Sequence, residues 1–511
     1  MLLVNEICYR FSPESLHITM GNIVTKNAFI GNTNANASAN ETSENSSQET
    51  ARQGTAAVAS PTSKIAILSK VPVPAIIPLS DDTSSLVSAI SEPTMSVDLN
   101  LSTSKYGCRP WCGIKLYSDL IQEGISYLDK RNGDANVIML YECPSSASTE
   151  TSFFNSQVFP IHDYPPGITV CKTVLGPLKF SMMNGAAYPS YLKEEPPAGL
   201  LEHWQRTLHL PLPTFCHEIP STSKVYAYLP LEHIPKHVHD PHVHYHLSGK
   251  DTLHLMMPQH TPKRLANTKD HRPCIAKVTH SMASSQGIFV IRTDEDELKF
   301  HKFIESSGNP SFIVTESVAL VQRNLSCHFF IHPTGEMIWF GTSEHLKTPN
   351  GTWCQDSILK MQDQDYLRDL LLVYARTVAD YCRALGFWGF CGIDVLIQAG
   401  SGKVYIVDLN PRTTGTCPAL MVATLFYRQF GYRVGIFRWA SNYAFPGSAK
   451  ELIQQVEEYN VKGRRQGRVV VASLYEASPA KTLVNIGVYG NDLEECQRVL
   501  NQFAKPVAPT A

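Results

Sequence analysis

The stretch that decides the fold is GFWGFCGIDVLIQAGSGKVYIVDLNPR, residues 386–412. Both halves are rich in β-branched and large apolar residues, as strands are, and the Gly and Ser residues between them favour a turn. Side chains alternate along a strand, so Asp408 and Asn410 share one face of this hairpin while Leu409 points to the other. Asp394 lies on the first strand. The pattern predicts that three oxygen-bearing side chains meet on one sheet face.

Such a face suits Mg²⁺, a hard cation that proteins hold with one or two carboxylates together with substrate phosphates. Arg412 follows on the same side, and its guanidinium fork fits a phosphate or a carboxylate. The alternative is that Asp394, Asp408 and Asn410 are polar residues at a solvated strand edge. Their neighbours are strongly apolar, however, and buried carboxylates need partners. We therefore predict that these three residues bind a metal and that Arg412 is the catalytic residue beside them.

The bulk composition excludes several classes of protein. The chain has 511 residues, a length typical of about two to four structural units. Its formal net charge is −2 and its Lys and Arg residues are dispersed, so we expect no nucleic acid and no membrane as a partner. The 13 cysteines are scattered, as free thiols in a reducing compartment are. With no run of about eighteen apolar residues, a soluble cytoplasmic protein is expected.

The N-terminal region differs from the rest in composition. Residues 31–64 are mostly Asn, Ala, Ser, Thr, Glu and Gln, with almost no large apolar residue. Such a segment cannot bury enough surface to offset its chain entropy. Residues 81–104 are again rich in Ser and Thr. We therefore expect residues 1–105 to be mostly disordered and the globular part to begin near residue 106.

Residues 273–290 resemble a phosphate-binding hairpin. A strand ends in Lys277-Val278, and a loop of small residues follows and returns as a second strand. Small side chains allow backbone N–H groups to approach phosphate oxygens closely. The alternative for Lys277 is an exposed strand lysine. The predicted phosphate-binding residues here are Lys277, Ser284, Ser285 and Gly287.

Three further segments bear on the site. Lys250 lies at a turn that leads into an apolar segment, and residues 318–322 (VALVQ) have the composition of a strand. Residues 367–385 place their apolar side chains on one face of a helix, and Gly386 is suited to end that helix directly before the hairpin.

A histidine-rich run lies between residues 233 and 246. Neutral imidazole is a common ligand of Zn²⁺ and Ni²⁺. Pro235 and Pro241 interrupt the run, however, and its spacing matches no established ligand set. We favour a polar loop that approaches a helix. The histidines are His233, His237, His239, His242, His244 and His246.

Together, residues 245–440 resemble the ATP-grasp superfamily of carboxylate-activating ligases. The most specific features are Gly392-Ile393-Asp394 and the later Asp408-Leu409-Asn410-Pro411-Arg412. The resemblance implies that Asp394, Asp408 and Asn410 hold Mg²⁺, or Mn²⁺, on ATP. It also implies that Lys250 and Lys277 contact the ATP phosphates and that Gln322 lies in the hinge strand near the base. The chain departs from the family pattern in two places: Asp408 stands where Glu is more frequent, and Gln322-Arg323-Asn324 where the hinge strand usually ends in an acidic residue.

The resemblance implies an α+β fold of the ATP-grasp type, in which two α+β subdomains clamp ATP. We expect an N-terminal α/β domain at 106–245, the ATP-grasp domain at 246–440 and a C-terminal α+β extension at 441–511. The implied reaction activates a small carboxylate, such as an amino acid, as an acyl phosphate that an amine then attacks. The low-complexity N-terminal sequence is similar to that of fungal ATP-grasp proteins of secondary-metabolite pathways. The alternative is a nucleotide-binding regulatory or scaffold protein that has lost turnover. The sequence leaves the two substrates and the oligomeric state open.

Overall fold

The structure is a computed structural model that describes the residues in eleven ranges. Residues 1–98 and 99–511 form separate units, and every described residue belongs to the second. The segment expected to be disordered, 1–105, lies outside the described residues. The ranges are 107–129, 136–143, 157–162, 170–234, 236–269, 271–281, 287–308, 310–347, 353–440, 443–462 and 467–506.

The predicted hairpin is confirmed as strands β12 (Gly389–Gln398) and β13 (Val404–Asn410), which pair antiparallel. Gly402 has a φ of +65°, and its N–H donates to the carbonyl of Gln398 at 3.0 Å. The hairpin forms one side of an eleven-stranded sheet with the order β13-β12-β9-β10-β11-β14-β17-β15-β18, in which β1 also pairs with β10 and β16 with β17. The other strands are β1 (Cys108–Pro110), β9 (Val321–Ile331), β10 (Met337–Lys347), β11 (Trp353–Lys360), β14 (Val434–Arg438), β15 (Tyr443–Phe445), β16 (Gly467–Ser478), β17 (Lys481–Gly490) and β18 (Lys505–Pro506).

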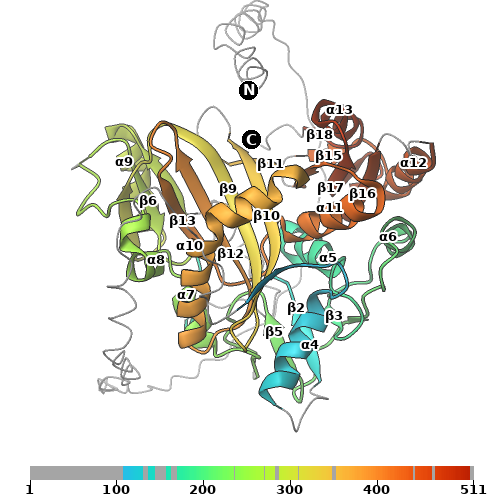
Figure 1. Cartoon of the computed structure of the whole chain (residues 1–511), viewed down its shortest axis with the longest axis horizontal. Coiled ribbons are helices and arrows are strands. Elements are labelled where there is room, and N and C mark those ends of the chain that lie inside the picture. Colours follow the sequence, from blue (N-terminus) through green and yellow to red (C-terminus); the bar gives the residue numbers. More distant parts are fainter. Residues whose placement is uncertain are drawn as a thin grey trace, which may run out of the picture. The chain divides into compact units, whose positions relative to one another are not determined.

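Helices cover the two faces of this sheet. The predicted helix before the hairpin is α10 (Gln364–Ala384), which crosses β9 and β10 (Figure 1). Phe329 and Ile393 point into the core beneath α10, whereas Phe330 and Phe390 point to the opposite face. That opposite face packs against α4 (Tyr117–Leu128) and α11 (Cys417–Phe430). Because side chains alternate, Asp394 lies on the same face as Phe390, away from α10.

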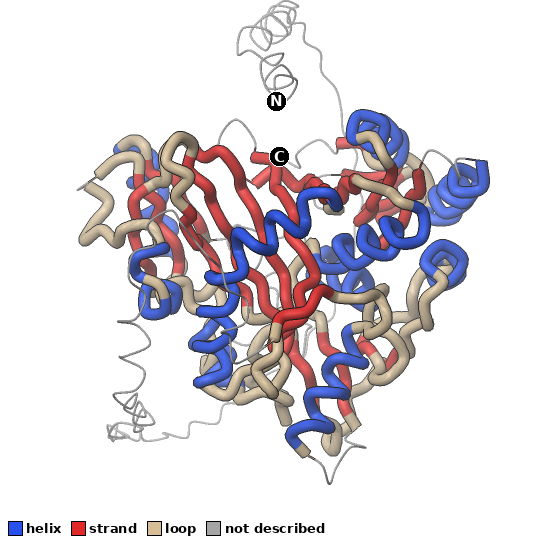
Figure 2. Tube along the Cα trace, in the orientation of Figure 1, coloured by secondary structure: helices blue, strands red, loops and turns tan. Residues whose placement is uncertain are grey.

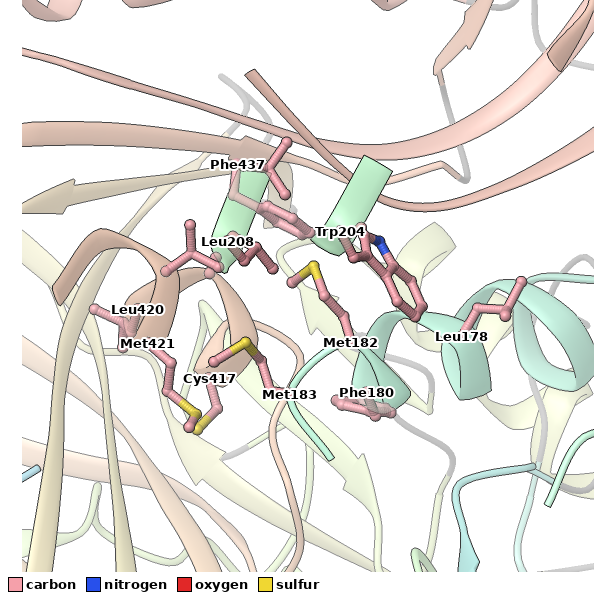
Figure 3. Packing of buried hydrophobic residues seen from close by; sticks show 14 of the residues in the cluster. Leu178, Phe180, Met182, Met183, Trp204, Leu208, Cys417, Leu420, Met421 and Phe437 are labelled. Carbon is pink, nitrogen blue, oxygen red and sulfur yellow. The ribbon is translucent and has the colours of Figure 1, made fainter. Parts of the chain in front are cut away.

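A second sheet is parallel throughout, with the order β4 (Phe215–Cys216), β3 (Ser190–Tyr191), β2 (Val137–Leu140) and β5 (Lys224–Ala227). Helix α5 (Gly176–Ser181) lies beside it, and helix α6 (Leu200–Leu208) packs on β16 of the large sheet. Figure 3 shows Met182 and Met183, directly after α5, between Trp204 of α6 and Cys417 of α11. This packing fixes the parallel sheet against the large one.

A three-stranded antiparallel sheet has the order β7 (Ile288–Ile291), β6 (Cys274–Val278) and β8 (Phe312–Glu316), with α9 (Asp294–Ser306) packed on it. The chain leaves β8 at Glu316 and enters the large sheet at Val321. The predicted strand at 318–322 is therefore wrong for its first three residues, where Leu320 has a φ of +50°.

The remaining helices lie outside the sheets, as the tube in Figure 2 shows. Two of them, α12 (Ala449–Lys462) and α13 (Leu493–Phe503), lie beside β16 and β17. Within the described ranges, no helix is both long and apolar enough to cross a membrane. The other remaining helices are α7 (Pro241–Leu247) and α8 (Thr252–Met256). Short helical turns lie at Cys171–Leu175, Pro258–His260 and Met361–Asp363.

Candidate active site

A row of polar side chains crosses three neighbouring strands of the large sheet. Asp394 on β12 is paired directly with Asp408 on β13 and, on its other side, with Ser326 on β9. Directly paired residues project from the same face of a sheet, and like charges in such a pair repel. The Ser326 hydroxyl donates to Asp394 Oδ1 at 2.6 Å. The structure thus brings the two predicted carboxylates together, and they need a cation.

Lys250 supplies a positive charge to this row. It lies at the turn before α8, and its Nζ donates to Asp408 Oδ1 at 2.5 Å and to Oδ2 at 2.7 Å. The Lys250 side chain is 9% exposed and that of Asp408 is 17% exposed, so the pair is largely shielded from water. The lysine predicted to contact phosphate therefore faces the predicted metal ligands.

Lys277 reaches the same strand from the three-stranded sheet. Its Nζ donates to the carbonyl of Val407 at 2.7 Å, and the residue is buried on β6. Burial lowers the pKa of Lys277 to about 8, against the opposing effect of Asp408. The alternative of an exposed strand lysine is thus wrong.

Asn410 and Arg412 continue the site toward the parallel sheet. Arg412 Nη2 donates to Asn410 Oδ1 at 2.7 Å, and Nη1 donates to the Tyr228 hydroxyl at 2.5 Å. The guanidinium also lies 4.8 Å from the centre of the Tyr228 ring. Tyr228 directly follows β5, at the carboxyl end of the parallel sheet, where open α/β sheets bind ligands. Arg412 therefore lies between Asn410, on the sheet face that carries Asp394 and Asp408, and the carboxyl end of the parallel sheet.

The donor set fits a hard cation. Burial and the facing Asp408 raise the pKa of Asp394 to about 6, while Ser326 and Lys250 lower it. Two carboxylates and the amide oxygen of Asn410 make an all-oxygen set, which suits Mg²⁺ or Mn²⁺ completed by phosphate oxygens. In the described part of the chain, no group of three or more His, Cys, Asp or Glu residues could hold a metal. A metal here therefore needs Asn410 and a phosphate as further ligands.

Other predicted site residues lie elsewhere. Ser284 and Ser285 are outside the described residues. Gly287 has a φ of +68°, and its carbonyl accepts from the N–H of Val278 at 2.8 Å, closing the turn between β6 and β7. Gln322 is exposed on β9, four residues or about 13 Å along the strand from Ser326, and does not join the cluster.

Three residues that the sequence analysis missed also belong to this region. Ser326 and Tyr228 position Asp394 and Arg412, but only the strand register shows it. Glu316 ends β8, at the passage into the large sheet, and accepts from the N–H of Lys263 at 3.1 Å. Glu316 lies six positions before Gln322. The sequence analysis missed it because both FIVTE and VALVQ have strand-like composition.

The histidine-rich run is only partly a polar loop. His239 and His244 are buried and pack on Phe387, at the start of the hairpin. Asp240 begins α7 by accepting from the N–H of His242 at 2.8 Å. A pocket of about 440 Å³ beside the run is lined by Phe159, Leu231, Glu232, Ile234 and residues 237–242. Two of the six histidines thus pack as buried aromatic side chains, whereas His233, His242 and His246 are exposed.

A comparison with protein families agrees with this geometry. Residues 255–410 match the family described as L-aspartate–L-methionine ligase, ATP grasp. The matched range contains Lys277, Asp394, Asp408 and Asn410, whereas Lys250 and Arg412 lie just outside it. The fold is α+β, of the ATP-grasp type. No curated protein sequence matches the chain.

Several solved structures are similar to the chain at low sequence identity. An ADP complex of N5-carboxyaminoimidazole ribonucleotide synthetase has a TM-score of 0.44 and 12% identity, over 63% of this chain and 90% of that one. The ADP complex of the Staphylococcus aureus N5-carboxyaminoimidazole synthetase has a TM-score of 0.43 and 9% identity, over 72% and 96%. An L-amino acid ligase from Bacillus licheniformis has a TM-score of 0.42 and 12% identity, over 74% and 99%.

Proposed function

We propose that this chain is an ADP-forming ligase that joins a carboxylate to an amine. The observation that supports it best is the row of Asp394 and Asp408, with Lys250 and Lys277 on one side and Arg412 on the other. Paired carboxylates with two lysines are suited to a metal–triphosphate, and an arginine at a ligand-binding edge is suited to a carboxylate or a phosphoryl group. Nucleotide binding alone does not require all five.

The proposed reaction has two steps. A carboxylate oxygen of the substrate forms a bond to the γ-phosphorus of ATP, and the bond from that phosphorus to the β–γ bridging oxygen breaks, releasing ADP. An uncharged amine then attacks the acyl carbon, the carbon–oxygen bond to phosphate breaks, and the nitrogen loses a proton. The products are an amide, inorganic phosphate and ADP.

The residues of the chain have separate roles in this proposal. Lys250 and Lys277 stabilise the negative charge that shifts toward ADP in the first transition state. Arg412 orients the carboxylate or the phosphoryl group. Asp394, Asp408 and Asn410 would hold Mg²⁺, which when bound neutralises phosphate charge. For Lys250 to reach phosphate, its ammonium must leave Asp408, and a cation between the carboxylates would make this favourable.

The finer assignments are also part of the proposal. The name of the matched family makes L-aspartate and L-methionine the first substrate pair to test. The division at residues 245 and 440 and a role in secondary-metabolite biosynthesis rest on the sequence resemblance, and the roles of Ser284, Ser285, Gly287 and Gln322 rest on it too. A cytoplasmic location rests on the cysteines, since none of the described ones forms a disulfide.

The test measures ADP release with pooled amino acids and organic acids, in the presence of Mg²⁺. We expect ADP release that depends on both an acid and an amine. Asp394→Asn and Asp408→Asn should each lower it about 100-fold or more and leave the fold intact. Asp365→Asn, at an exposed carboxylate on α10, is the matched control. Tight Mg·ATP binding with no acid-stimulated ADP release would favour the scaffold alternative, and normal turnover in both site variants would contradict the site assignment.

A further inference from the structure

Lys179 is a buried amine that the proposed mechanism does not use, and burial lowers its pKa to about 7. It lies on α5 and is 5% exposed. Its Nζ lies 3.9 Å from the centre of the Trp439 ring and 4.5 Å from that of Phe180. Among the described residues, no carboxylate forms an ion pair or a hydrogen bond with it. Aromatic faces offset only part of the cost of burying an ammonium group, so the site favours an anion.

The groups around Lys179 are neutral or positive. Its electrostatic neighbours are the thiols of Cys143 and Cys171 and the guanidinium of Arg412. Burial raises the pKa of each thiol to about 11, so both are uncharged at neutral pH. Glu142 lies on the same edge and acts on Cys143, but it is not among the groups that act on Lys179. No charge of the described chain balances Lys179.

Two chains of contacts connect Lys179 to Arg412. On one side, Phe180 packs against Tyr228 at 5.2 Å between ring centres, and Tyr228 holds Arg412. On the other side, Trp439 covers the loop after Arg412 so closely that a Cβ on Gly415 would lie 2.0 Å from the indole. Both cations therefore lie around the carboxyl end of the parallel sheet, where ligands bind in such sheets.

The loop after Arg412 contains another unused polar group. Thr413 is 2% exposed, and its hydroxyl has no hydrogen-bond partner among the described residues. Buried hydroxyls are nearly always hydrogen-bonded, so an unpartnered one indicates a missing partner. Asn410 and Tyr228, the partners of Arg412, are both neutral. Arg412 also acts electrostatically on Asp394, so among the described residues Lys179 is the cation without an acidic neighbour.

We infer that Lys179, together with Thr413 in the loop after Arg412, forms a binding subsite for a substrate carboxylate other than the one that is phosphorylated. The inference rests on the proposed function, and it makes the substrate a dicarboxylic acid. One carboxylate would lie beside the nucleotide and the other against Lys179, whose charge it would balance. Lys179 would then select the substrate without contacting the reacting atoms.

The test compares L-aspartate with L-2-aminobutyrate, which carries a methyl group in place of the side-chain carboxylate. Binding of each to the full chain with Mg·ADP is measured by titration calorimetry, without any reaction. We expect the wild type to prefer L-aspartate by about 10-fold to 100-fold, the range of a charge-assisted hydrogen bond. Lys179→Met should abolish the preference and Lys179→Arg should keep most of it, while Lys450→Gln, at an exposed lysine on α12, should not change it.

Lys179→Met should also melt no lower than the wild type, because it removes an unpaired buried charge. Lys179→Gln provides a second neutral variant in case the methionine variant does not fold. The inference is overturned if the preference for L-aspartate persists in the neutral variants. It is also overturned if the wild type binds neither acid, or binds both with equal affinity. Lys179-dependent binding without ADP release would contradict the ligase proposal alone. ADP release with a preference independent of Lys179 would contradict the inference alone.

Discussion

The ion pair between Lys250 and Asp408 competes with metal binding, because the lysine ammonium and the proposed metal ion use the same carboxylate. In Lys250→Met, Asp394 and Asp408 face each other without the ammonium, so we expect the free energy of unfolding to fall by about 1–3 kcal/mol. Because no ammonium then competes for the carboxylates, Mg²⁺ should raise the melting temperature of this variant more than that of the wild type. Thermal unfolding with and without Mg²⁺ measures both effects. Equal Mg²⁺ shifts would contradict a metal at this row.

Glu142 makes stability depend on pH. It is 3% exposed, and burial raises its pKa to about 7, with Lys193 acting in the opposite direction. A carboxyl whose pKa is higher in the folded than in the unfolded chain binds more protons when folded, so stability falls as pH rises from about 4.5 to 7. The shift corresponds to about 3 kcal/mol. Urea unfolding at pH 5 and pH 8 should show this loss in the wild type and not in Glu142→Gln; equal pH dependence in both would contradict it.

The part of the candidate site that lies on one hairpin could be predicted from the sequence, whereas the part that comes from distant segments could not. Asp394, Asp408, Asn410 and Arg412 lie within 19 residues of one hairpin, so alternation alone places them together. Ser326, Tyr228 and Lys179 come from distant parts of the chain. Nothing in their own sequence neighbourhoods distinguishes them from ordinary core residues, because only strand register and helix packing bring them to the site.

At the scale of elements, helix α4 packs closely against Trp388, which directly precedes β12, because the helix has Gly124 at the contact. A Cβ on Gly124 would lie 2.3 Å from the Trp388 ring. Alanine normally favours a helix by about 1 kcal/mol, yet here Gly124→Ala should destabilise the fold by about 1–3 kcal/mol, because the ring must move. In a Trp388→Leu background the same substitution should cost less. Urea unfolding of the four variants measures this coupling, with Ser126→Ala on the exposed face as the control; additive effects would contradict the close contact.

Elements with a strong local pattern were predictable and others were not. Helix α10 and the hairpin follow from apolar periodicity with glycines at their ends. Strand β11 contains Gln355 and Asp356 among apolar residues, and its identity comes from pairing with β10 and β14. The same holds for the passage from β8 to β9, where two β-rich segments adjoin and only the register of β6 with β8 selects Phe312–Glu316. Where two neighbouring segments have equally strand-like composition, pairing with distant strands determines which residues form the strand.

At the scale of the whole described unit, the large sheet continues through the expected boundary at residue 440. Strand β14 lies before that boundary, and its neighbour β17 lies after it. Arg438 connects the two parts: it donates to both oxygens of Asp356 at 2.9 and 2.8 Å, and to Asn501 and the carbonyl of Ala504 at 3.0 and 2.8 Å. We therefore expect the sheet and the C-terminal helix α13 to unfold together.

Arg438→Met tests this connection. Arg438 and Asp356 are 3% and 4% exposed, so the substitution leaves a buried carboxylate unpaired and should cost about 3–5 kcal/mol. The double variant Arg438→Met/Asp356→Leu should recover most of the loss, because no charge then remains buried. Arg368→Met, which removes a surface ion pair with Asp365, should cost less than about 1 kcal/mol. Urea unfolding followed by fluorescence and by circular dichroism measures these values. Coincident curves are expected for the wild type, whereas an early separate transition of the C-terminal part would show that residues 441–506 fold independently of the site.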